Sequence, residues 1–131
     1  MKKIHVSGTR KQATARATLS EGRGTLRINS QHITTFSTPI ARAKLLEPII
    51  IAGDLANSLC IELNIRGGGT NSQAEAGRVA IARALVAYNK KLEKQFLEYD
   101  RQLIVPDVRV KETRKPNRHG KARAKTQKSY R

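Results

Sequence analysis

The side chains best suited to chemistry in this sequence are its cations, which gather at the two ends of the chain. Of the 26 Lys and Arg residues, seven fall within residues 1–27 and ten within residues 109–131, and each of these segments holds a single acid. Residues 28–108 are nearly balanced, with nine basic and eight acidic side chains. A net charge of +16 disfavours a compact free protein through self-repulsion, which a polyanionic partner relieves. The pattern predicts phosphate binding by both ends.

The residue types that serve enzymes are present without the arrangements that enzymes need. His5, His32 and His119 lie far apart in the sequence, and neither Gly-x-Ser-x-Gly nor His-Glu-x-x-His occurs. Cys60 is the only cysteine, so it cannot form an internal disulfide or join a cysteine-rich metal site. We therefore expect no catalytic residue, no metal and no cofactor, and a reducing cytosol as the compartment.

Neither membrane insertion nor export is expected from the apolar content. Apolar stretches such as Ile49–Ala52 fall far below the roughly 20 residues that a spanning helix needs. Lys2 and Lys3 are followed by polar residues where a secretory signal would have its apolar segment. Of the two polyanionic partners that the charge suggests, nucleic acid is thus favoured over an anionic membrane.

Three consecutive glycines, residues 67–69, follow a strand pattern and precede a helical one. Such a loop can hold a phosphate on its backbone N–H groups. A phosphate loop of the nucleotide-binding type would end in Gly-Lys-Ser/Thr, whereas Thr70 and Asn71 follow here, and Ser72 takes the third glycine of the dinucleotide pattern. Two interpretations remain and both can hold: a plain strand-to-helix turn, and a close approach to an RNA backbone.

The elements that must position these groups begin with strands. Apolar and polar residues alternate over residues 3–8 and 12–19, which predicts two strands. A glycine-containing turn at residues 22–24 leads to a short strand at 25–29, which we expect to complete a hairpin with the strand before it. The order of elements predicts an α+β domain with crossover connections.

Helical spacing then alternates with one more strand. A helix is predicted from Pro39, and Pro48 is expected to end or kink it. Residues 59–66 alternate cleanly, with Leu and Ile facing a core. An Ala-rich helix over residues 72–88 has apolar residues on two sides, so both sides are expected to make contacts.

The last predicted elements are a short helix at 90–100 and a strand at 103–105. Residues 111–131 contain no Val, Ile, Leu, Met, Phe or Trp, so this segment cannot bury enough apolar area to offset its ordering entropy. We therefore expect a globular α+β body over residues 1–108 and an extended basic C-terminal tail over residues 109–131.

Several motifs together resemble the universal family of the ninth protein of the small ribosomal subunit. The central one is G-G-G-x-x-x-Q-A-x-A-x-R-x-A-I-A-R-A-L from Gly67 to Leu85, and the C-terminal one is K-A-R-A-K-x-Q-K-S-Y-R from Lys121 to Arg131. The opening Ser7–Ala17, with Tyr99-Asp100-Arg101 and Asp107-x-Arg109, matches as well. The Gln-Lys-Ser-Tyr-Arg ending resembles archaeal or eukaryotic members, and the short N-terminus favours an archaeon. Residues 116–119 depart from the family, whose members often have more glycine and lysine there, which leaves the path of the tail's first half open.

The resemblance implies a two-layer sheet-and-helix domain with a left-handed βαβ crossover, against the usual right-handed rule. It also implies a structural, non-enzymatic constituent of the small ribosomal subunit in the cytoplasm, with its body bound to ribosomal RNA in the subunit head. Its tail would reach the anticodon stem-loop of peptidyl-site tRNA, and neighbouring proteins of the head would be further partners.

The expected site residues follow from the basic ends and from this resemblance. The RNA-binding residues are expected to be Arg10, Lys11, Arg16, Arg66, Gly67, Gly68, Arg109, Arg114, Lys115, Arg118, Lys121, Arg123, Lys125 and Lys128. The tRNA-contacting residues are expected to be Ser129, Tyr130 and Arg131. A free RNA-binding or RNA-chaperone protein is the alternative, and an enzyme on a kinase-like fold is a more distant one.

Overall fold

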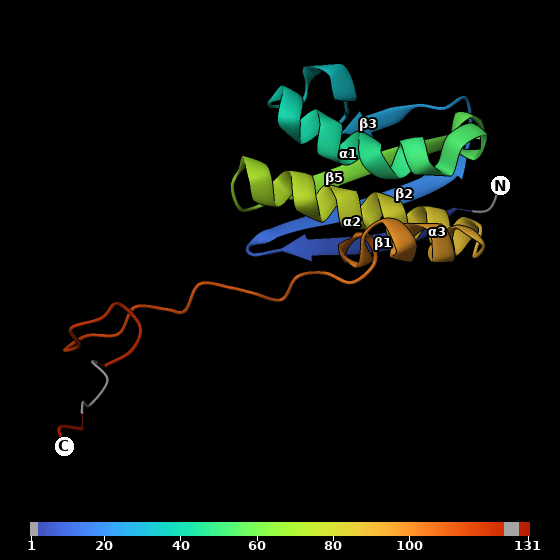
Figure 1. Ribbon diagram of the computed structural model, residues 1–131. Helices are drawn as coiled ribbons and strands as arrows, with labels where there is room; N and C mark the ends of the chain where they lie inside the picture. The colour runs from blue at the N-terminus through green and yellow to red at the C-terminus, as the bar shows by residue number, and fades with distance from the viewer. Residues whose placement is uncertain (1–2, 125–128) are drawn as a thin grey trace.

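A five-stranded sheet forms one layer of the protein, and its helices form the other (Figure 1). The computed structural model describes residues 3–124 and 129–131. The strands lie in the order β1-β2-β5-β3-β4. Their bounds are Ile4–Arg10 for β1, Ala13–Glu21 for β2, Leu26–Ile28 for β3, Gln31–His32 for β4 and Leu59–Arg66 for β5. All three α-helices of the described chain cover the same face of the sheet, which leaves the other face open (Figure 1).

The two strands predicted first form a hairpin, in a register that pairs Ile4 with Leu19 and Arg10 with Ala13. The predicted hairpin between β2 and β3 is wrong. Strand β5 lies between them, antiparallel to β2 and parallel to β3. Both β2 and β3 alternate apolar and polar residues, so each can bury one face beside any neighbour, and the turn at 22–24 does not by itself fix the pairing.

The connection from β3 to β5 passes through helix α1 (Pro39–Ala52). Viewed from the helix side, β3 and β5 run to the left and the chain moves from β3 at the top to β5 below it (Figure 1). This is a left-handed βαβ crossover, as the resemblance implied. Thr38 caps α1 by accepting a hydrogen bond from the Ala41 N–H at 3.3 Å. Pro48 does not end the helix, which continues to Ala52 with Pro48 buried inside it.

The central helix α2 (Thr70–Tyr88) packs on both of its sides, as its two apolar faces predicted. The sheet lies on one side, and α1 and α3 (Leu92–Tyr99) flank it (Figure 1). Strand β1 comes so close to α2 that a Cβ at Gly8 would lie 2.5 Å from the carbonyl oxygen of Ala76 and 2.7 Å from the amide nitrogen of Ala80. Glycine is therefore required at position 8 for this contact between strand and helix.

The strand expected at residues 103–105 does not form. Arg101–Leu103 is a 3-10 turn, and the carboxylate of Asp100 caps it by accepting a hydrogen bond from the Gln102 N–H at 2.9 Å. Leu103 is fully buried, and the Arg83 guanidinium donates to the carbonyl of Ile104 at 2.9 Å. These tertiary contacts, which are invisible to local patterning, override the strand propensity of the apolar run.

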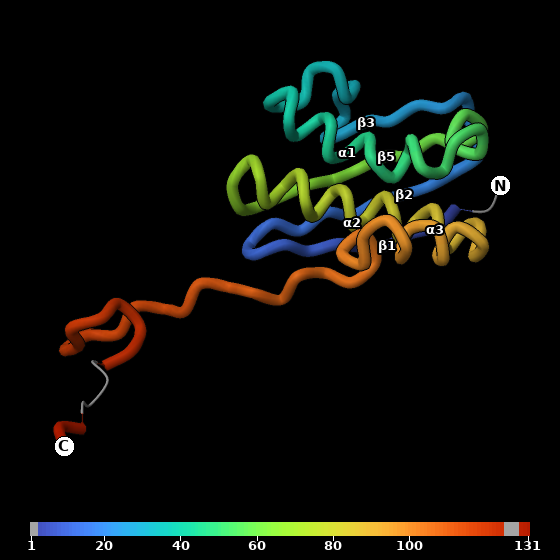
Figure 2. The backbone as a smooth tube through the Cα atoms, in the orientation of Figure 1, coloured from blue at the N-terminus to red at the C-terminus, as the bar shows by residue number. Residues whose placement is uncertain are grey.

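Beyond this turn the described chain has no helix or strand and runs away from the body (Figures 1 and 2). The only backbone hydrogen bond among residues 106–124 joins the Lys115 N–H to the carbonyl of Lys121 at 3.0 Å, which closes a small loop. In residues 3–124 and 129–131 no helix has the length and hydropathy needed to cross a membrane.

Candidate nucleic-acid interface

The open face of the sheet carries polar and cationic side chains. Strict alternation places Leu59, Ile61, Leu63 and Ile65 of β5 against the helices, each at most 3% exposed. Glu62, Asn64 and Arg66 of β5 face outward and line, with their neighbours on β1, β2 and β3, a shallow hollow of about 1000 Å³. Its polar lining consists of His5, Ser7, Arg16, Thr18, Arg27, Asn29, Ser30, Glu62, Asn64 and Arg66.

Cross-strand register sets the spacing of the cations in the hollow. Arg16 of β2 lies opposite Asn64 of β5, and Arg66 lies opposite Thr14. Arg27 of β3 is paired with Glu62 of β5 in the parallel register. Arg16 and Arg66 are among the predicted RNA-binding residues. Arg27 is not, although the alternation of residues 25–29 could have placed it on the same face.

One side chain that the sequence analysis missed secures the edge of this hollow. Asn29 has a positive φ of 48° and turns its amide back onto β5. Its Oδ1 accepts a hydrogen bond from the Ile65 N–H at 2.9 Å, and its Nδ2 donates to the Ile65 carbonyl at 3.2 Å. Asn is among the residues that tolerate this backbone conformation, so Asn-Ser after a short strand was the available indication.

The glycine loop packs against the turn of the first hairpin. Gly67 and Gly68 have φ values of 78° and 66°, a region that residues with a Cβ rarely adopt. A Cβ at Gly67 would lie 2.5 Å from the carbonyl oxygen of Gln12, and one at Gly68 would lie 3.0 Å from the Cβ of Ala13. The turn interpretation therefore accounts for both glycines. The packing also brings Lys11, at the tip of the hairpin, to the end of the sheet that carries Arg66.

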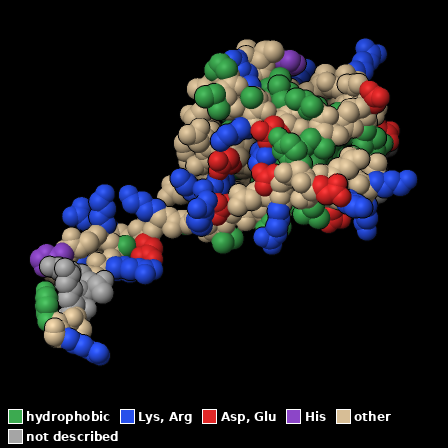
Figure 3. All heavy atoms as spheres, in the orientation of Figure 1, with side chains coloured by type: hydrophobic (Ala, Val, Ile, Leu, Met, Phe, Trp, Pro, Cys, Tyr) green, Lys and Arg blue, Asp and Glu red, His purple; other side chains and the backbone are tan. Residues whose placement is uncertain are grey.

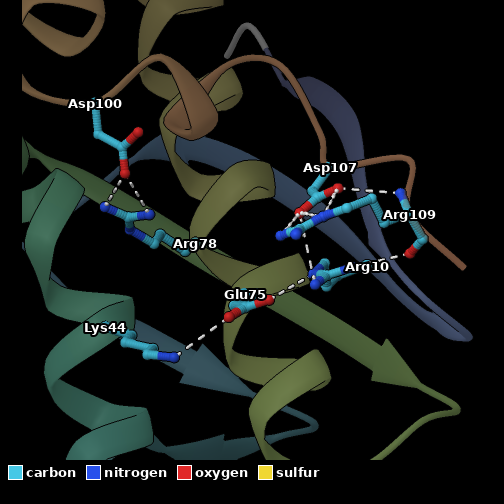
Figure 4. A network of polar contacts seen from close by, with 7 residues as sticks. All are labelled: Arg10, Lys44, Glu75, Arg78, Asp100, Asp107 and Arg109. Atoms are coloured by element: carbon cyan, nitrogen blue, oxygen red, sulfur yellow. Dashed lines mark hydrogen bonds and ion pairs between the residues drawn. The ribbon is translucent and has the colours of Figure 1, made fainter.

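Arg10 is placed differently from the other predicted RNA-binding residues of the body, because acids surround it. Its side chain is 14% exposed. The guanidinium donates from Nε to Glu75 at 2.7 Å, and its Nη2 lies 3.6 Å from Asp107 (Figure 4). Its Nη1 donates to the carbonyl of Arg109 at 3.0 Å. Lys44 of α1 reaches the other oxygen of Glu75 at 3.4 Å.

The acids of this network are held in their charged form. Hydrogen bonds from the side chain and the backbone N–H of Arg109 lower the pKa of Asp107 to about 2. Partial burial pushes the pKa of Glu75 upward, but the hydrogen bonds and charges of Arg10 and Lys44 outweigh it, so this pKa lies below its ordinary value. Both carboxylates are thus anionic at neutral pH and available to hold cations.

A second network uses Arg78 on the helix side of the body. Its Nη1 and Nη2 each donate to one oxygen of Asp100 at 3.1 Å (Figure 4). Its Nε lies 2.6 Å from a carboxylate oxygen of Glu47, an ion pair that is close but not aligned as a hydrogen bond. Both networks bind cations of the body to acids of the body.

The tail presents its cations differently. Arg114, Lys115, Arg118 and Lys121 are all exposed. Arg123 is paired with Glu112, the only acid of the tail, and its Nε donates to that carboxylate at 3.0 Å. Figure 3 shows Lys and Arg groups projecting along the tail, whereas basic and acidic groups are mixed over the visible face of the body.

The remaining predicted tail residues divide into two sets. Ser129, Tyr130 and Arg131 are exposed, and the side chain of Tyr130 is among the most exposed apolar groups of the described chain. Lys125 and Lys128 lie outside the described residues. None of the tail cations that the structure describes lines the hollow of the sheet. Within residues 3–124 and 129–131, no group of three or more His, Cys, Asp or Glu side chains is placed to hold a metal ion.

Several kinds of RNA-binding protein could carry exposed cations of this type, and comparison with known proteins identifies the family. The family described as ribosomal protein S9/S16 matches residues 8–131. The chain belongs to this family. A small ribosomal subunit protein uS9 of Methanococcus vannielii is 42% identical over 134 residues, with 100% of both chains covered. Proteins of the same name from two strains of Methanococcus maripaludis, C7 and C5, are also 42% identical over the full length of both chains.

Membership in the S9/S16 family confirms the resemblance on which the sequence analysis relied, and its archaeal character. The family consists of structural, non-enzymatic components of the ribosome, so the kinase-like enzyme alternative is set aside. The protein is accordingly a structural part of the ribosome, and its networks of Arg and acid side chains are to be understood as architecture rather than as catalytic groups.

Proposed function

We propose that this protein is a structural constituent of the small ribosomal subunit, that its body binds ribosomal RNA in the subunit head, and that its tail reaches peptidyl-site tRNA. The full-length relatives named small ribosomal subunit protein uS9 support the first part. Ribosomal RNA, the anticodon stem-loop of that tRNA and neighbouring proteins of the head are the proposed partners. The cytoplasm, within the ribosome, is the proposed location.

The observation that carries the proposal is that Arg side chains of the body are paired with acids, whereas the cations of the tail are exposed and have almost no acids beside them. In the body, Arg10 and Arg78 are half-buried and paired with acids. In the tail, ten cations meet a single acid over residues 109–131, and the described ones are exposed. A segment with exposed cations and no apolar core gains order by neutralising phosphates. This contrast supports a division into a body over residues 1–108 and a tail over residues 109–131.

The body offers a second, smaller set of cations for RNA. Arg16, Arg27 and Arg66 line the open hollow with hydroxyl and amide side chains, and Lys11 lies at the same end of the sheet as Arg66. The lining contains no Phe, Tyr or Trp side chain on which a base could stack. This chemistry suits contacts with phosphates and ribose hydroxyls, which give affinity and orientation without reading base sequence.

The tip of the tail has the longest reach in the chain. At about 3.3 Å per extended residue, the segment after residue 109 can span on the order of 70 Å. Arg131 ends it with a planar guanidinium, which suits a bidentate contact with a phosphate better than an ammonium group does. These features support a contact of residues 129–131 with anticodon-loop phosphates.

Co-sedimentation tests the proposal against a free RNA-binding protein. Tagged full-length protein is expressed in an archaeal host, and the lysate is separated on a sucrose gradient before and after a wash in high salt. We expect the protein to stay with the small subunit through the wash, because many contacts with folded RNA would hold it. Release to the top of the gradient, with RNA binding intact in the released fraction, would support the RNA-chaperone alternative instead.

A further inference from the structure

The tail is attached to the body through a short segment, residues 104–109, which we call the tail root. Its first attachment is made by Arg83 of α2. The guanidinium donates from Nε to the carbonyl of Ile104 at 2.9 Å and from Nη1 to the carbonyl of Ser7 at 3.0 Å. One side chain thereby links the root to α2 and to β1, the edge strand of the sheet.

Asp107 closes the root upon itself. Its carboxylate accepts hydrogen bonds from the backbone N–H of Arg109 at 3.0 Å and from the side chain of Arg109, at 2.9 Å from Nε and 2.7 Å from Nη2 (Figure 4). The side chain of Asp107 is 9% exposed, whereas that of Arg109 is 81% exposed. Asp107 thus faces the body, and Arg109 lies over it on the solvent side.

Arg10 joins this closed root to the body. Its three nitrogen atoms meet three different groups: Nε meets Glu75 of α2, Nη2 meets Asp107, and Nη1 meets the carbonyl of Arg109. At 14% exposure and with these partners, its guanidinium has no free edge for a bidentate contact with a phosphate. Arg10 therefore links β1, on which it lies, to α2 and to the tail root.

The attachment stops at Arg109. In the part of the chain that the structure describes, the hydrogen bonds and ion pairs made after this residue join tail residues to one another, as between Arg123 and Glu112 and between Lys115 and Lys121. The direction of the tail is therefore set over the root, by the last groups that contact the body.

We propose that Arg10, Glu75 and Asp107 form a clasp that fixes the direction in which the tail leaves the body, and that they are positioning residues rather than RNA ligands. A tail with a fixed starting direction explores fewer conformations, so it loses less entropy when it reaches a distant phosphate. The expected gain in tRNA binding depends on the proposed function, whereas the existence of the clasp does not. Exposed ion pairs alone contribute little. This cluster differs from them because the side chains of Arg10 and Asp107 are only 14% and 9% exposed, and because Arg10 also donates to the carbonyl of Arg109.

The test measures the direction of the tail root in the full-length protein. Spin labels are placed at Glu93→Cys on α3 and Lys111→Cys just past the root, in a Cys60→Ser background, and their distance distribution is recorded by pulsed electron resonance. Asp107→Asn removes the charge that faces Arg10. The matched control is Glu112→Gln, which removes a carboxylate that is paired only within the tail.

We expect Asp107→Asn to broaden the distance distribution at least twofold while the melting temperature of the body stays close to that of the parent, and Glu112→Gln to leave the width unchanged. Glu75→Gln, which acts on Arg10 from the opposite side, should broaden it too, and it serves as the readout if Asp107→Asn does not fold. A narrow distribution in a folded Asp107→Asn or Glu75→Gln protein, or a parent distribution as broad as theirs, would overturn the clasp. Deletion of residues 129–131 tests the tail function separately, because it leaves the clasp intact.

Discussion

Four exposed cations of the tail should account for a large share of the salt dependence of RNA binding. Lys111, Arg114, Arg118 and Lys121 make no side-chain ion pair within the residues that the structure describes, unlike Arg123, which is held by Glu112. We expect replacement of the four by Gln to make the fall of the binding constant with salt less steep. The physical reason is that each contact between a cation and a phosphate releases a condensed counterion.

The size of the effect follows from the number of contacts removed. One phosphate contact changes the log–log slope by about 0.7 on single strands and about 0.9 on duplex, so four contacts correspond to about 3 to 4 units. For the parent protein we expect a slope on the order of −5 to −10, because roughly half of the cations at the two ends would meet a phosphate. The assay is fluorescence anisotropy with a labelled rRNA fragment of the subunit head, titrated at increasing potassium chloride concentrations.

A matched control separates specific contacts from net charge. Lys90, Lys91, Lys94 and Arg101 belong to the body, beside or on α3 and before the tail root, and their replacement by Gln removes the same total charge. The control slope should stay within about one unit of that of the parent. Equal slopes for the tail variant and the control would refute the reasoning, because the dependence on salt would then report only overall charge.

Three further predictions concern the body and the root. Gly8→Ala should lower the free energy of unfolding by about 1–3 kcal/mol, because the added Cβ would meet the backbone of α2. Gly69→Ala should lower it less, because a Cβ there has nothing within 4 Å, and thermal unfolding compares the two variants. Limited trypsin should rapidly trim residues 109–131 of the free protein and leave the body, and added rRNA should slow the trimming; equal rates with and without rRNA would count against the tail's role. The pKa of the Asp107 carboxyl should be about 2 when measured by carbon-detected NMR, below its ordinary 3.8. The ionised carboxylate therefore stabilises the folded root fully above pH 3.8, and this stabilisation is lost as the pH falls through 2. A titration midpoint near 3.8 would contradict the root geometry.

The elements of the body could be predicted where one physical rule dominates. Strand β5 alternates without exception, so period-two burial placed all of its apolar side chains correctly. The pairing of β3 with β5 could not be predicted, because an alternating strand is compatible with either neighbour. The apolar run 103–105 reads locally as a strand, but a cap by Asp100 and the burial of Leu103 make it a turn.

The candidate site was predicted by charge, and charge alone could not separate exposed cations from paired ones. Lys11 and Arg10 are neighbours in the sequence, yet only Arg10 is enclosed by acids. Its partner Glu75 is 65 residues away and the carbonyl of Arg109 is 99 residues away, distances along the chain that local patterning does not cross. The handedness of the crossover came from the family resemblance and not from periodicity.

The most direct test of the central claim is the dissociation of tRNA from the peptidyl site of purified small subunits that carry a protein lacking residues 129–131. The body of this variant keeps its open hollow and its clasp, so the protein should enter the subunit in normal amount. We predict normal incorporation and faster tRNA dissociation than from subunits with the full-length protein, because the proposed contact of the tail tip with anticodon-loop phosphates is lost. Unchanged dissociation at normal incorporation would contradict the account.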